Sequence, residues 1–219
     1  MRASHPHPAQ AALRGLYAIT SEAIGNDTAT LIAAAEHALA GGARLLQYRD
    51  KKNRAPLREL HAHALLGLCH EHGAIFIIND DVDLAQSVGA DGVHIGSADA
   101  PLTAARAKLG PQAVIGVSCA GSLERALTAQ AEGASYVAFG RFFDSRTKPN
   151  APQARPELLA QARMRLQIPI CAIGGVTPQN AAALIACGAD MVAAVEGVFG
   201  AADIQMAARA YARLFLTEH

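Results

Sequence analysis

The chain has 219 residues, and 51% of them are hydrophobic, which is enough to bury a full core. Lysine plus arginine and aspartate plus glutamate both number 19, so nothing in the charge balance indicates a nucleic-acid surface or a polybasic membrane patch. We therefore expect small-molecule partners, no nucleic acid and no membrane.

Residues 1–13 are expected to form a flexible N-terminal extension, because "MRASHPHPAQAAL" contains no apolar core long enough for a signal peptide. No later apolar run approaches the roughly 20 residues of a membrane span. The four cysteines are dispersed and form no CxxC pair, which indicates reduced and mostly buried thiols. These features predict a cytoplasmic protein.

From residue 14 onward the chain alternates between short apolar runs and segments with helical periodicity. Five of the runs follow a Gly-Ala pair, at residues 42, 73, 89, 133 and 188, and each pair predicts a helix end because glycine readily takes the left-handed conformation that closes a helix. The expected strands, in chain order, are "LYAIT", "RLLQY", "IFIIN", "DGVHIG", "AVIGVS", "SYVAFG", "IPICAIGG" and "DMVAAV".

Eight strands that alternate with helices, and that are apolar on both faces, indicate parallel pairing covered by helices. The sequence therefore predicts an α/β protein with one domain, a closed (β/α)8 TIM barrel over residues 14–219. An open doubly wound sheet is the rival fold, but no GxGxxG follows the first strand and no P-loop is present.

Polar residues follow the expected strands at their C-terminal ends, where the loops of a barrel converge on one site. They are Gln47, Arg49 and Lys51 after the second strand, Asn79, Asp80 and Asp81 after the third, His94 and Asp99 after the fourth, Ser118 after the fifth, "GRFFDSRTKPN" after the sixth, Gly174 and Gly175 after the seventh, and Glu196 and Gly197 after the eighth. The strand starts carry no comparable set. We therefore predict one site at the C-terminal mouth.

Alternation along a strand would point Gln47, Arg49 and Lys51 together into that mouth. Two cations and an amide suit an anionic ligand, although charges at a strand end are often only solvated. Lys148, in another loop, favours a shared anion site.

Asp80 and Asp99 each precede a short helix, so either could simply cap that helix by accepting backbone N–H bonds. Placed together beside cations, they could instead supply the carboxylates that Mg²⁺ takes when it also binds phosphate oxygens. Both interpretations remain open from the sequence.

The glycines after the last two strands fall where barrels commonly bind a phosphate through backbone N–H groups, although glycine also merely permits tight turns. Ser145 and Thr147, with Arg146 between them, could add donors to a second phosphate, or their loop could be a flexible lid. Four histidines cluster on the second helix, at positions 61, 63, 70 and 72. They form i,i+2 pairs that do not share a helix face, so they are expected to be solvated, and no i,i+4 pair exists to hold a metal. His94 could be a core or a site residue.

Six motifs occur in the order and spacing of one family: "QYRDK", "IINDDVDLA", "DGVHIG" followed by Asp99, "IGVS", "SRTK" and "IGGV". Each motif alone is weak, but six in register over residues 15–200 are highly specific. By these motifs the chain resembles the thiamine phosphate synthase family.

The resemblance implies a barrel transferase that joins 4-amino-5-hydroxymethyl-2-methylpyrimidine diphosphate to 4-methyl-5-(2-phosphoethyl)thiazole and releases diphosphate. It implies Mg²⁺ bound by Asp80 and Asp99, and catalytic roles for Arg49, Lys51, Ser118 and Lys148. The implied substrate-binding residues are Gln47, Tyr48, Arg49, Asp50, Lys51, Asn79, Ser118 and Lys148 on the pyrimidine diphosphate side, and Ser145, Arg146, Thr147, Gly175, Val195 and Glu196 on the thiazole phosphate side.

Two positions depart from the pattern of this family, in which a proline or small residue commonly stands at Asp144 and a serine at Glu196. A carboxylate at position 196 would repel a phosphate, so either the backbone alone binds the phosphate or this subsite differs.

Two other functions compete with the synthase. A thiazole tautomase on the same barrel would need a proton-transferring histidine about where Ala120 stands, and would not need two magnesium carboxylates. A non-catalytic barrel that binds a phosphorylated metabolite would not need the complete set of cation, metal and phosphate positions. The sequence leaves the existence of a homo-oligomer open.

Overall fold

The computed structural model describes residues 13–25, 27–96, 99–144 and 152–216. Its eight strands are β1 (Gly15–Ile19), β2 (Leu45–Tyr48), β3 (Ile75–Asn79), β4 (Gly92–Ile95), β5 (Val114–Ala120), β6 (Tyr136–Phe139), β7 (Ile170–Ile173) and β8 (Met191–Ala194). Its helices are α2 (Thr28–Ala40), α3 (Ala55–Glu71), α4 (Val82–Val88), α5 (Leu102–Leu109), α6 (Leu123–Ala131), α7 (Glu157–Arg165), α8 (Pro178–Ala186), α9 (Glu196–Phe199) and α10 (Ile204–Arg213).

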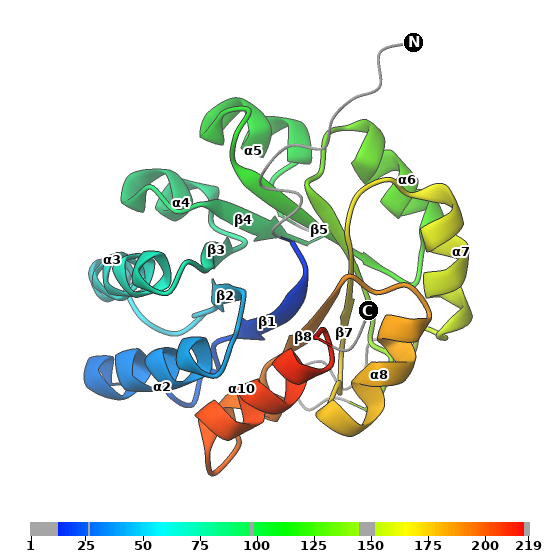
Figure 1. The fold of residues 1–219 in the computed structure, drawn as a ribbon. Coiled ribbons are helices and arrows are strands. Elements are labelled where there is room, and N and C mark those ends of the chain that lie inside the picture. The colour runs from blue at the N-terminus through cyan, green and yellow to red at the C-terminus, as the bar shows by residue number, and fades with distance from the viewer. Residues whose placement is uncertain (1–12, 26, 97–98, 145–151, 217–219) are drawn as a thin grey trace.

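The strands form a closed parallel barrel in sequence order, with the helices arranged around it (Figure 1). Strand β1 pairs with β2 on one side and with β8 on the other, which excludes the open sheet. The predicted single-domain (β/α)8 fold is confirmed. The five predicted helix ends are also confirmed, because the glycine of every Gly-Ala pair has a positive φ angle.

Alternation along the strands divides the core into an inner and an outer layer. Tyr17 and Leu45 point into the barrel, where they meet inward side chains of the other strands. Their neighbours Leu16 and Leu46 point outward and pack beneath the helices. Each strand is therefore apolar on both faces, as expected for a parallel sheet covered by helices.

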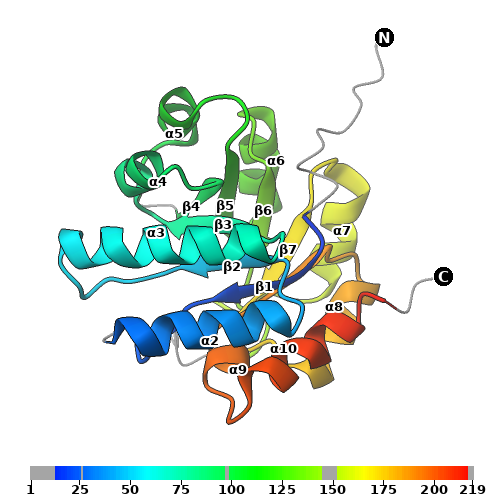
Figure 2. The same ribbon diagram turned by 60° about the vertical axis from the view of Figure 1, so that its left-hand side comes forward.

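The last helix completes the outer layer beside the first helix and strand. Helix α10 packs against α2 and β1, so residues from the two halves of the chain lie together (Figure 2).

None of the helices in the described ranges combines the length and apolar character needed to cross a bilayer. The cysteines are free thiols, three of them buried.

One histidine of α3 contradicts the expected solvated cluster. His61 is fully buried, with Nε2 2.9 Å from the Thr28 hydroxyl and Nδ1 3.0 Å from the Tyr48 hydroxyl. His63, His70 and His72 are exposed, as predicted. The prediction failed for His61 because its partners lie on α2 and β2, far from it in the sequence.

Candidate active site

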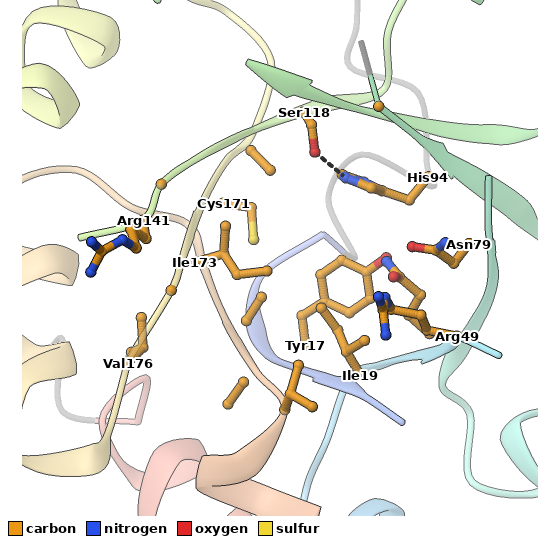
Figure 3. Close-up of a pocket in the computed structure, with 18 of the residues that line it drawn as sticks. Tyr17, Ile19, Arg49, Asn79, His94, Ser118, Arg141, Cys171, Ile173 and Val176 are labelled. Carbon is orange, nitrogen blue, oxygen red and sulfur yellow. Dashed lines mark hydrogen bonds between the residues drawn. The ribbon is translucent and has the colours of Figure 1, made fainter. Parts of the chain in front are cut away.

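A cavity of about 600 Å³ opens at the C-terminal end of the barrel and is lined from the ends of all eight strands. Figure 3 shows Arg49 and Asn79 on one side of it, and Arg141 with Val176 on the other. The predicted site residues that line the cavity are Gln47, Arg49, Lys51, Asn79, Asp80, Asp99, Ser118, Gly175, Val195 and Glu196. Four other predicted site residues lie outside the part of the chain that the structure describes, namely Ser145, Arg146, Thr147 and Lys148.

Tyr48 and Asp50, which were predicted from the sequence to bind substrate, do not line this cavity. Strand alternation turns the Tyr48 ring outward into the layer beneath the helices, where its hydroxyl donates to Asp50 at 2.8 Å. The Asp50 carboxylate also accepts from the backbone N–H groups of Lys52 and Asn53, at 2.9 and 3.0 Å. Burial alone would raise the pKa of Asp50, but these hydrogen bonds outweigh it and lower the pKa. The two residues hold the loop that carries Arg49 and Lys51.

Two cations of that loop are each anchored by an acid. A guanidinium nitrogen of Arg49 lies 2.7 Å from a carboxylate oxygen of Glu22, which belongs to the loop after β1. The Lys51 ammonium lies 3.0 Å from Asp80 Oδ2. Glu22 was not foreseen from the sequence, because its role depends on β1 and β2 being neighbours.

The capping interpretation does not hold for Asp80 or Asp99. The N-cap of α4 is Asp81, whose carboxylate accepts from Leu84 N at 2.9 Å, and α5 is preceded by Pro101. Asp80 instead has a left-handed backbone, with φ of 63°, and its N–H donates to the His94 carbonyl at 2.8 Å. Both aspartates are thus left to face the cavity.

Asp80 and Asp99 lie close enough for their charges to interact. Burial disfavours ionisation of Asp80, but Lys51 and the hydrogen bonds around it hold its pKa below the usual value. The pKa of Asp99 is raised, first by burial and then by the adjacent Asp80. Of the two acids, Asp80 is therefore the more readily ionised, and its charge opposes the ionisation of Asp99. Among the described residues no cluster of three or more His, Cys, Asp or Glu side chains could hold a metal ion.

A chain of hydrogen bonds runs along the cavity wall from β2 to β5, and all of its members except Tyr136 line the cavity. The Gln47 amide nitrogen donates to the Tyr17 hydroxyl at 2.6 Å, and the Tyr17 and Tyr136 hydroxyls are 2.9 Å apart. His94 Nδ1 lies 2.9 Å from the Tyr136 hydroxyl, and His94 Nε2 lies 2.9 Å from Ser118 Oγ. Tyr17 and Tyr136 were missed from the sequence, although each is a polar residue at an inward strand position.

The loop after β7 is held by three neighbouring segments. Gly174 and Gly175 have φ angles of 100° and 64°, and a Cβ on Gly175 would overlap the Asp144 carbonyl oxygen. The Asn180 amide of α8 donates to the Gly175 carbonyl at 3.1 Å. The Tyr211 hydroxyl of α10 donates to the Val176 carbonyl at 2.8 Å. The glycines thus let the backbones of two loops approach each other beside the cavity.

Two arginines, Arg141 and Arg125, line the cavity although neither was given a role from the sequence. Arg141 donates to the Asp144 carboxylate at 2.6 Å, so the unusual acid at position 144 has a cationic partner. Arg125, on α6, donates to the Ser118 carbonyl at 3.2 Å. Glu196 begins α9, and its carboxylate accepts from the Ser21 hydroxyl at 3.4 Å.

The comparisons with known proteins agree with one another. A family model described as thiamine monophosphate synthase matches residues 16–198. The thiamine-phosphate synthase of Thioalkalivibrio sulfidiphilus is 56% identical over 203 residues, covering 93% of this chain and 96% of that protein. The thiamine-phosphate synthase of Methylococcus capsulatus is 53% identical over 202 residues, covering 92% and 89%.

A solved structure gives the same result. The thiamine phosphate pyrophosphorylase from Pyrococcus furiosus has a TM-score of 0.84 at 31% identity, and the match covers 93% of this chain and 96% of that one. Sequence and structure together place this chain in the thiamine monophosphate synthase family.

Proposed function

We propose that the cavity binds 4-amino-5-hydroxymethyl-2-methylpyrimidine diphosphate and 4-methyl-5-(2-phosphoethyl)thiazole, and joins them to form thiamine phosphate and diphosphate. The family is one of transferases with this activity, and the observation that carries the proposal here is the grouping of Arg49, Lys51 and the Asp80–Asp99 pair at one mouth. These groups suit a diphosphate that must be bound and then released.

The two carboxylates fit Mg²⁺. This ion usually takes one or two carboxylates together with phosphate oxygens and waters. Asp80 opposes the ionisation of Asp99 and raises its pKa, and a cation shared by the two carboxylates would relieve this opposition. Bound there, Mg²⁺ would neutralise charge on the diphosphate.

Side chains near the Asp80–Asp99 pair bind the diphosphate from the ends of β2, β3 and β5. Arg49 and Lys51 supply positive charge from the loop after β2, and Asn79 supplies an amide from β3. Ser118 faces the same cavity from β5 and can donate a hydroxyl hydrogen bond. Preorganised donors of this kind stabilise charge that develops on a leaving group.

We assign the thiazole phosphate to the side of the cavity opposite the diphosphate, near Gly175 and Val195. Arg141 lies there and adds a cation that the sequence interpretation did not include (Figure 3). Ser145, Arg146, Thr147 and Lys148 remain predicted contacts. Glu196 interacts with Ser21, which supports phosphate binding by the backbone in place of its side chain.

The reaction needs no general base. The bond between the pyrimidine methylene carbon and the diphosphate oxygen breaks first, and the aminopyrimidine ring delocalises the positive charge left on carbon. The thiazole nitrogen then forms the new bond with its own lone pair, so no proton is removed. The protein's contributions are charge stabilisation and the alignment of two substrates.

An isomerase of the tautomase type is not favoured. Ala120 lines the cavity at the position expected for the histidine of that enzyme, and an alanine side chain cannot transfer a proton. A cytoplasmic location remains an expectation from the sequence.

The test is a product assay. Purified protein with Mg²⁺ and both substrates should form thiamine phosphate, detected by mass spectrometry, whereas reactions that lack one substrate or contain excess EDTA should not. No product above background would contradict the proposal. Binding of both substrates without product would indicate a non-catalytic binding protein.

A further inference from the structure

The hydrogen-bond chain from Gln47 to Ser118 joins two parts of the site that are far apart in the sequence. Gln47 lines the cavity from β2 and Ser118 lines it from β5. Between them lie Tyr17, Tyr136 and His94, three side chains that meet inside the barrel. Figure 3 shows the last link, from His94 to Ser118.

The order of donors in this chain follows from counting protons. The Gln47 amide nitrogen can only donate, so the Tyr17 oxygen accepts from it. Tyr17 then donates to Tyr136, and Tyr136 donates to His94 Nδ1. A neutral imidazole that accepts at Nδ1 carries its proton on Nε2, which donates to the Ser118 oxygen.

The opposite order fits the structure less well. If Ser118 donated to His94, then Tyr136 would donate to Tyr17, and the Tyr17 oxygen would accept from both of its neighbours. The Tyr17 proton would then be left without an acceptor, although Tyr17 is only 1% exposed. Leaving a buried polar group unsatisfied is costly, so the first order is the stable one.

The packing around the tyrosines keeps the chain in place. The Tyr136 ring stacks on His94, with centroids 5.7 Å apart, and meets the Tyr17 ring edge-on at 5.9 Å. Gly116 provides the space, because a Cβ there would overlap the Tyr136 ring. Burial raises the pKa of both tyrosines, so both hydroxyls keep the protons that the chain needs.

We propose that Tyr136 and Tyr17 are positioning residues that orient the Ser118 hydroxyl through His94. Because His94 Nε2 donates to the Ser118 oxygen, the Ser118 proton is free to be donated into the cavity, toward the diphosphate. This inference rests on the proposed function, in which Ser118 binds that group. It gives Tyr136, which does not line the cavity, a role in the catalytic arrangement through His94.

The first test measures the His94 tautomer directly. Nitrogen-15 NMR of histidine-labelled protein, with the His94→Gln variant used to identify the signal, should show a neutral ring protonated on Nε2. In Tyr136→Phe the Nδ1 acceptor site loses its donor, so the Nε2–H preference should weaken. A ring protonated on Nδ1, or on both nitrogens, overturns the proposal.

The second test is a double-mutant cycle on kcat. Ser118→Ala should lower kcat by about 100-fold, typical of losing one preorganised donor. Tyr136→Phe should lower kcat by about tenfold in the otherwise unchanged protein but by no more than about twofold in Ser118→Ala. Tyr17→Phe should have a smaller effect than Tyr136→Phe, because Tyr136 can still donate to His94.

Tyr211→Phe is the matched control, because it also removes one buried tyrosine hydroxyl. Its effect should be the same factor in both backgrounds, since Tyr211 bonds to the Val176 carbonyl and not to the chain. An equal loss from Tyr136→Phe in both backgrounds overturns the proposal, as does a Ser118→Ala variant with unchanged kcat.

Binding of inorganic diphosphate in the presence of Mg²⁺, measured by calorimetry, separates this inference from the proposed function. The same cycle should appear in Kd: Tyr136→Phe weakens binding several-fold only when Ser118 is present. That pattern supports the positioning role even if no thiamine phosphate forms. Additive effects on Kd contradict the role even if the product assay succeeds.

Discussion

Asp80 combines an unusual backbone with several polar contacts. Its φ of 63° is unusual for a residue with a side chain, and its N–H is bonded to the His94 carbonyl. Its carboxylate contacts Lys51 and Asp99. The sequence offered Asp80 as either a cap or a ligand, because it precedes a short helix and lies near cations. The structure assigns the cap to Asp81.

Separate substitutions of Asp80 and Asp81 distinguish the roles of these two adjacent acids. We predict that Asp80→Asn lowers kcat by about 100-fold with little change in Tm, because asparagine tolerates a left-handed backbone but supplies no charge. Asp81→Ala should cost about 1 kcal/mol of stability through the lost cap while kcat stays close to that of the unchanged protein. Steady-state kinetics and thermal unfolding would check both. An Asp80→Asn variant that loses stability but keeps turnover would show that the charge has no catalytic role.

At the scale of elements, the site depends on loops whose neighbours come from elsewhere in the chain. The glycines after β7 were predicted from the sequence as phosphate donors. The structure adds a reason that the sequence does not show, which is the close approach of the loop after β6. In the same way, the alternation of β2 predicted inward positions for Gln47 and Arg49, but the anchoring of Arg49 by Glu22 could not be read from sequence spacing.

Gly175→Ala should be more harmful than the same change at Gly73. The two glycines have nearly equal φ angles, 64° and 63°, so both substitutions impose similar left-handed strain, about 1–2 kcal/mol. A Cβ at Gly73 meets nothing within 4 Å, whereas one at Gly175 overlaps the Asp144 carbonyl oxygen. We expect Gly175→Ala to cost an additional 1–3 kcal/mol or so and to raise KM for the thiazole phosphate. Urea unfolding and kinetics on both variants provide the check, and equal losses of stability would argue against the close approach.

For the whole molecule, hydrophobic periodicity and helix-ending glycines were enough to predict eight strands and their closure. Local patterns carry that information, because each strand is short and each helix ends just before the next strand. The contacts that join distant segments were not predictable in this way. His61 is an example: the helical pattern predicted a solvated face, but Thr28 and Tyr48 bury the ring between α2, α3 and β2.

The buried His61 gives the fold a pH dependence. Burial lowers its pKa, and the nearby Asp50 and Asp27 only partly oppose this shift. In the unfolded chain His61 takes up a proton near its usual pKa of 6.5, whereas the folded protein does so only at lower pH. The free energy of unfolding should therefore fall as pH drops below about 6.5, by at most about 1.4 kcal/mol per pH unit from this group.

Urea unfolding between pH 7.5 and 5.5 would measure that slope. His61→Gln removes the titrating group, so the variant should be less stable at pH 7.5 but should lose less stability on acidification than the unchanged protein. His63→Gln is the control, because His63 is exposed and its replacement should leave the slope unchanged. A slope that is the same in all three proteins would mean that His61 does not contribute.

The bond from Tyr211 to the Val176 carbonyl also bears on the order in which the protein can mature. Barrel closure needs β8 to pair with β1, and Tyr211 adds the last of the contacts that hold the loop after β7. A chain emerging from the ribosome can form its early strand and helix units before that point. The bond to Val176, however, can form only after the residues up to Tyr211 have been made and have folded back onto the barrel.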